Sequence, residues 1–82
     1  MDAKNIKRAI ERETGIPAKT IQLIESGPVD GSLTVGWERV IFNYTHNAEE
    51  CVARCDVKQF GKRGRCEAVN YEFIGGPGYG GR

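Results

Sequence analysis

The feature that most constrains this chain is a C-terminal stretch in which apolar and polar residues alternate with a period of two. Every second residue of 51–57 is small or apolar, and the same alternation returns over 69–73. A period of two is typical of a β-strand that buries one face. The sequence Gly-Lys-Arg-Gly at 61–64 fits a three-residue hairpin loop whose last glycine adopts the left-handed conformation. We therefore predict a β-hairpin over residues 50–74.

A turn centred on Arg63 also predicts the register of this hairpin. It places Val57 opposite Val69 on an apolar face. On the other face it places Arg54 opposite Glu72, and these opposite charges form an attractive cross-strand pair. A shift of one residue would mix apolar and charged side chains on both faces, so the register is well specified.

The N-terminal residues 2–14 predict a helix. Asp2 suits the N-cap, and Ile6 and Ile10 lie one turn apart on a narrow apolar stripe. Gly15 is expected to end the helix, because glycine adopts the left-handed conformation at helix C-termini without steric cost.

The middle of the chain predicts two further strands, over 20–25 and 32–44, joined by turn residues at 26–31. The apolar alternation of the second strand changes parity after residue 37. Either a bulge at Glu38 and Arg39 or a break in the strand there explains the change.

Together these elements predict an α+β fold in which one N-terminal helix packs on a four-stranded antiparallel meander sheet. The predicted core between helix and sheet includes Trp37, Val69, Tyr71 and Phe73. The chain has 82 residues, which suffice for a single domain, predicted over 1–74. The last eight residues, 75–82, include five glycines and predict a flexible tail. A hydrophobic fraction of 39% and a charged fraction of 28% fit a soluble globular domain. No apolar run approaches the roughly 20 residues of a membrane span, so we expect no membrane partner.

Three cysteines and one histidine are the candidates for metal binding or nucleophilic catalysis. In a strand, Cys51 and Cys55 lie about 13 Å apart, too far to share an ion. The predicted register places Cys66 opposite Phe60, on the face away from the other two cysteines. His46 falls in a polar connection, and nothing marks it as the base for a thiol nucleophile. We therefore predict no metal, no cofactor and no catalysis, and reduced thiols in a cytoplasmic protein.

Residues 6–27 resemble a bacterial helix-turn-helix unit through a glycine turn and its apolar neighbours: Ile10, Gly15, Ile16, Ile21 and Ile24. In that family the second helix enters the major groove, so the resemblance implies that Lys19, Thr20 and Gln22 face bases. The same run also resembles the helix-to-strand corner of ubiquitin-like folds. Residues 18–25 therefore stay open between a second helix and a strand, and neither resemblance assigns a family.

The best candidate for a partner-binding site is the hairpin loop and its flanks. It combines four cationic side chains with one aromatic ring: Lys58, Phe60, Lys62, Arg63 and Arg65. Such a group suits an acidic groove on a protein, or phosphates with the ring stacked on a base. The chain carries 12 lysines and arginines against 11 acidic residues, a net charge of +1, whereas proteins that coat phosphate backbones usually carry a clear positive excess. This balance favours a protein partner.

We therefore expect a small non-catalytic binding or regulatory protein that acts by protein–protein contact, as an inhibitor or modulator of a larger machine does. The contact is expected at the hairpin loop and the sheet face without a helix. The alternative is a nucleic-acid-binding protein that uses the same loop or the helix-turn-helix-like segment. An outer edge strand at 20–25 also offers a surface for a homodimer.

Overall fold

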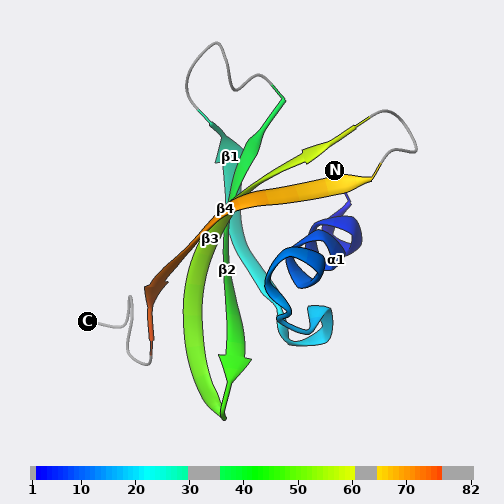
Figure 1. Cartoon of the computed structure of the whole chain (residues 1–82). Coiled ribbons are helices and arrows are strands. Elements are labelled where there is room, and N and C mark those ends of the chain that lie inside the picture. The colour runs from blue at the N-terminus through cyan, green and yellow to red at the C-terminus, as the bar shows by residue number, and fades with distance from the viewer. Residues whose placement is uncertain (1, 30–35, 61–64, 77–82) are drawn as a thin grey trace.

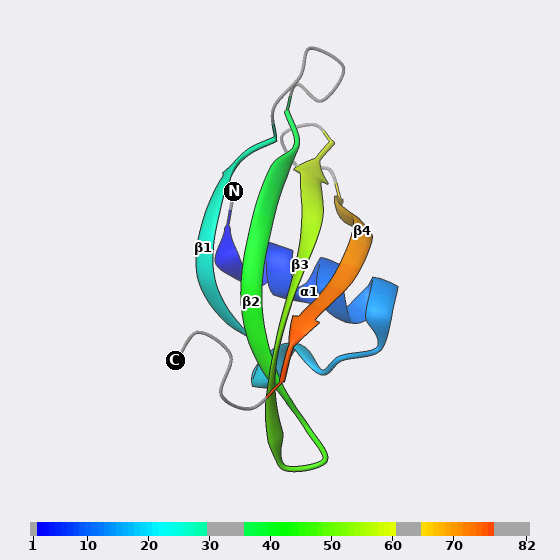
Figure 2. The ribbon, with the colours of Figure 1, turned by 90° about the vertical axis from the view of Figure 1, so that its left-hand side faces the viewer.

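The computed structural model describes residues 2–29, 36–60 and 65–76, and it confirms the predicted α+β fold. Neighbouring strands are antiparallel and follow one another as a meander in the order β1-β2-β3-β4. The elements are α1 (Ala3–Thr14), the short 3-10 helix η1 (Ala18–Thr20), β1 (Gln22–Pro28), β2 (Glu38–His46), β3 (Glu49–Gln59) and β4 (Cys66–Gly75). α1 lies across one face of the sheet, and no described helix covers the other face (Figures 1 and 2). Among these described elements, none is a helix of the length and apolarity that crossing a membrane requires.

The ends of α1 follow the predicted signals. The Asp2 carboxylate accepts a hydrogen bond from the backbone N–H of Lys4 at 3.2 Å, which caps the first turn. Gly15 has a φ of 83° and donates its N–H to the carbonyl of Glu11 at 2.8 Å. A side chain at this φ would be strained, so the glycine is what lets the chain leave the helix here.

Residues 18–25 resolve to a single 3-10 turn followed by a strand. Pro17 precedes η1, and the Thr20 hydroxyl donates back to the Pro17 carbonyl at 2.9 Å. Ile21 is buried in the core, and β1 begins directly after it. The helix-to-strand corner is therefore confirmed, and the second helix that the helix-turn-helix resemblance requires is not formed.

β2 begins at Glu38 and pairs with β3 without any shift of register. Gly36, with a φ of 89°, lies in a turn just before it. The parity change at Glu38 and Arg39 is therefore a break before the strand and not a bulge within it. Most of the strand predicted over 32–37 lies outside the described residues. At the other end of β2, Asn47 and Ala48 both have positive φ and connect it tightly to β3.

The predicted register of β3 and β4 is confirmed in the middle of the hairpin and is off by one residue towards both ends. Arg54 lies opposite Glu72 as predicted, and their side chains form an ion pair. Towards the loop, however, Asp56 lies opposite Val69, a shift of one residue that comes from an irregularity at Asn70. Asn70 has a φ of 58°, a conformation that asparagine tolerates better than most residues.

This shift changes which residues of β4 face the helix. Cys66 lies opposite Gln59 rather than Phe60, so it shares the helix-covered face with Cys55 and is buried. The prediction that it lies on the opposite face was wrong, because the sequence spacing gave no sign of the extra residue. Val69 correspondingly moves to the face away from α1, and its predicted place in the core was also wrong.

The core lies between α1 and the covered face of the sheet, and α1 packs chiefly against β4. Its largest fully buried side chains are Phe42, Ile10, Ile21, Val40, Val57 and Cys55. Tyr71 and Phe73, also predicted core residues, are 37% and 54% exposed. β4 extends to Gly75, the first residue of the predicted flexible tail, and residues 77–82 of that tail lie outside the described residues.

Candidate functional site

The predicted loop site is present in part as a compact group, the tip cluster, formed by Trp37, Lys58, Phe60 and Arg65. The rings of Trp37 and Phe60 meet edge to face, with centroids 6.2 Å apart. The Lys58 ammonium lies 5.3 Å from the centroid of Phe60 and 5.9 Å from that of Trp37, within cation–π range of both. Lys62 and Arg63, which complete the predicted site, lie outside the described residues.

Two backbone hydrogen bonds hold the tip cluster in place. Phe60 donates its N–H to the Arg65 carbonyl at 3.2 Å across the β3–β4 hairpin, and Val29 donates to the Trp37 carbonyl at 3.2 Å. Gly36 leaves the room that Lys58 uses, since a Cβ there would lie 3.2 Å from its Cε. Trp37 was predicted in the core, and its place beside Phe60 brings together residues that are far apart in the sequence.

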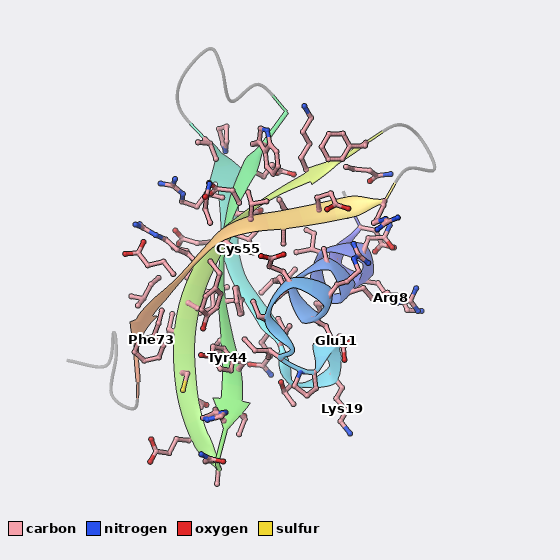
Figure 3. All side chains as sticks on the ribbon, viewed as in Figure 1. Arg8, Glu11, Lys19, Tyr44, Cys55 and Phe73 are labelled. Atoms are coloured by element: carbon pink, nitrogen blue, oxygen red, sulfur yellow. The ribbon has the colours of Figure 1, made fainter. Side chains whose placement is uncertain are left out.

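The residues of the helix-turn-helix alternative do not share a helix face. Lys19 is exposed on η1 and points away from the sheet (Figure 3). The Thr20 hydroxyl is engaged with Pro17, and Gln22 begins β1 opposite Asn43. No described α-helix presents these three side chains together to a groove.

The sheet face away from α1 carries a polar network, of which the sequence indicated only the pair of Arg54 and Glu72. Asp56 is only 7% exposed on this face, and its carboxylate accepts from Arg39 at 3.1 Å and from the Asn70 side chain at 3.1 Å. Arg54 and Glu72 form an exposed ion pair beside it. Because these charges already pair with one another, this face offers fewer unpartnered groups than the tip cluster.

The three cysteines are buried thiols that pack as small hydrophobic residues. Burial raises the pKa of Cys55 to about 12, with smaller contributions from the neighbouring Asp56 and Cys66. Burial also raises the pKa of Cys66, although the Arg12 guanidinium partly opposes the effect. A raised pKa lowers the thiolate fraction, and the thiolate is the reactive form. Within the described ranges, no three His, Cys, Asp or Glu residues are grouped to hold a metal ion.

A cleft of about 550 Å³ lies at the end of the sheet opposite the tip cluster, and sequence reasoning missed it. It lies between the C-terminal end of α1, the end of β2 and the middle of β4, and its lining includes Glu13, Gly15, Pro17, Tyr44, His46 and Tyr71. The hydroxyls of Tyr44 and Tyr71 are hydrogen-bonded at 2.8 Å. The only signal in the sequence is the helix stop at Gly15 and Pro17, because both residues line the cleft.

Comparison of the chain with protein-family models, with curated proteins and with solved structures gives no match. The structure therefore offers two surfaces on which to base a function. One is the tip cluster, where aromatic rings lie beside cations, and the other is the cleft, where aromatic rings lie beside a carboxylate.

Proposed function

We propose that this chain is a small non-catalytic binding protein that regulates a larger protein by occupying an acidic surface on it with the tip cluster. The observation that carries the proposal is the exposure of the Phe60 ring. This side chain is 48% exposed, although its ring contacts both Trp37 and Lys58. Protein interfaces are anchored by such aromatic and cationic side chains, which bury a large apolar area and pair with acidic groups.

The fixed geometry of the cluster supports this role. Cation–π contact and hairpin closure hold Lys58 and Phe60 before any partner arrives, so binding costs less side-chain entropy. Arg65 lies 3.6 Å from the carboxylate of Glu67, which leaves the cluster moderately rather than strongly basic. A moderate charge, like the net charge of +1 for the chain, favours a mixed apolar and acidic protein surface over a phosphate backbone.

Nucleic-acid binding is the second candidate, and the same exposed ring favours it. A base can stack on Phe60 while Lys58 and Arg65 contact phosphates. Binding of that kind weakens steeply as salt is added, whereas a contact dominated by apolar burial depends on salt much less.

The proposal also places the protein in the cytoplasm, with its thiols reduced. Three cysteines, an odd number, and their burial as thiols support a reducing compartment. A homodimer through an edge strand stays a prediction. β1 is an edge strand of the sheet, but its pairing with β2 is irregular at Ile24, and such irregularities oppose edge-to-edge pairing.

Site-specific photo-crosslinking tests the proposal. The photoreactive residue p-benzoylphenylalanine replaces Phe60 in the full chain, which is then irradiated in extract of the cells that produce it. Ile24 is the matched control position, because it is exposed to a similar degree (52%) but lies on β1 away from the tip cluster. The expected result is a discrete protein adduct from position 60 that survives nuclease treatment and disappears when Lys58→Glu is added.

Two outcomes would contradict it. An adduct from position 60 that nuclease removes would establish the nucleic-acid alternative in place of the protein partner. Equal adducts from positions 60 and 24 would show that the tip cluster has no special role in binding.

A further inference from the structure

The cleft beside Tyr44 is a second surface whose chemistry differs from that of the tip cluster. Tyr44 follows Trp37 by seven positions in the sequence, which corresponds to roughly 23 Å at about 3.3 Å per residue. In Figure 3, Tyr44 lies on the lower part of β2, whereas β2 begins at the top of the view. An inference about the cleft therefore does not rest on the function proposed for the tip.

Two tyrosine rings form a fixed aromatic wall in this cleft. Phe42 packs behind both of them, with ring centroids 5.9 Å from Tyr44 and 6.4 Å from Tyr71. The hydrogen bond between the two hydroxyls joins their outer ends. Burial, and to a lesser extent the hydrogen bond with Tyr71, raise the pKa of Tyr44, so its hydroxyl stays neutral. Tyr71 is nevertheless partly exposed, and a ligand can therefore reach its ring.

The α1 side of the cleft contributes a negative charge. Glu13 lines the cleft, and none of the ion pairs in the described part of the chain involves its carboxylate. The last turn of α1 adds to the negative potential, because helix C-terminal carbonyls carry the negative end of the helix dipole. Arg12, the basic residue of that turn, donates instead to the Cys66 carbonyl and does not line this cleft.

We propose that the cleft binds an arginine side chain presented by a protein partner. A guanidinium stacks flat on an aromatic ring and also donates two parallel hydrogen bonds to a carboxylate. Tyr71 and Glu13, which both line the cleft, supply these two groups. Pro17, another lining residue, provides apolar contact for the methylene stem of the arginine. Charge complementarity thus selects a basic occupant, and the planar wall selects arginine over lysine.

An NMR titration of the ¹⁵N-labelled full chain with N-acetyl-arginine amide at pH 7.5 and low salt tests this assignment. The expected result is saturable shifts at the amides of Gly15, Thr45 and Tyr71, with a dissociation constant on the order of millimolar for so small a probe. The indole N–H of Trp37 should not move, which separates this site from the tip cluster. N-acetyl-citrulline amide, which has the same shape without the charge, should bind about fivefold more weakly or not at all.

The Glu13→Gln variant should weaken arginine binding by about two- to fivefold, as expected for an exposed charge pair. Glu11→Gln is the matched control, because it makes the same change of charge on the same helix at a residue that does not line the cleft. The proposal would be overturned if N-acetyl-citrulline amide bound as tightly as the arginine probe, or if Glu13→Gln and Glu11→Gln weakened arginine binding equally. It would also be overturned if N-acetyl-leucine amide bound more tightly than the arginine probe. Absence of saturable shifts with the wild-type chain would overturn it as well.

Discussion

The two ends of the sheet both expose aromatic rings, but they hold them by different means. At the tip cluster, Phe60 contacts Trp37 and Lys58 at the edge of the molecule, away from the main core. At the cleft end, Tyr71 packs on Phe42, which is fully buried under α1. The first ring is held by local contacts and the second by the core itself.

This difference has a consequence for stability. A side chain that packs on the core contributes to the free energy of unfolding, whereas one that contacts mainly exposed neighbours contributes little. We therefore expect substitutions at the cleft end to destabilise the fold, and substitutions at the tip to change binding with little effect on folding. The single tryptophan, Trp37, reports on the tip by its fluorescence.

The largest effect is expected for Phe42→Ala. Removing a fully buried phenylalanine leaves a cavity that costs about 3–5 kcal/mol in the free energy of unfolding. Urea denaturation followed by circular dichroism measures it. Phe42→Leu, which keeps most of the volume, should cost less than half as much. A loss below about 1 kcal/mol for Phe42→Ala would show that the cleft end is not anchored in the core.

The irregularity at Asn70 is expected to give the next largest effect. Asn70→Ala loses the hydrogen bond to the Asp56 carboxylate and strains a residue with positive φ, at a cost of about 2–4 kcal/mol. Asn70→Gly loses the hydrogen bond but tolerates the φ, so it should be about 1 kcal/mol more stable than the alanine variant. Thermal and urea unfolding of both variants check this order, and a reversed order would show that backbone strain is not important there.

The buried thiol of Cys55, which lies in β3 between the tip cluster and the cleft, should make the free energy of unfolding depend on pH. Its pKa is raised to about 12 in the folded protein, so the unfolded state ionises first. The stability that this thiol contributes is fully present below about pH 8.5 and is lost as the pH rises towards 12, by at most about 1.4 kcal/mol per pH unit. The difference in unfolding free energy between wild type and Cys55→Ala should therefore shrink from pH 8 to pH 11. A constant difference would argue against the raised pKa.

The smallest effects on the free energy of unfolding are expected for two substitutions, one at the cleft and one at the tip cluster, which can be compared directly. Tyr71→Phe removes only the hydroxyl bonded to Tyr44 and should cost about 0.5–1.5 kcal/mol. Phe60→Ala should change the unfolding free energy by no more than about 0.5 kcal/mol, yet it should shift the emission of Trp37, which loses its ring partner. If Phe60→Ala were the more destabilising of the two, the contrast between the ends would be wrong.

Much of the fold follows from the sequence, because its signals are local. Asp2 and Gly15 mark the ends of the helix through bonds to residues a few positions away. The alternation over 51–57 selects the buried face of β3, because successive side chains of a strand point to opposite faces. Opposite charges on Arg54 and Glu72 indicate the register correctly in the middle of the hairpin.

The tertiary structure decided the rest, because it depends on partners that are distant in the sequence. The shift that buries Cys66 occurs at Asn70, whose side chain is held by Asp56 on the neighbouring strand. Trp37 joins the tip cluster through contacts with Lys58 and Phe60, which no local pattern predicts. The cleft forms where residues 13–17, at and after the end of α1, meet β2 and β4, and only packing of the helix on the strands brings these segments together.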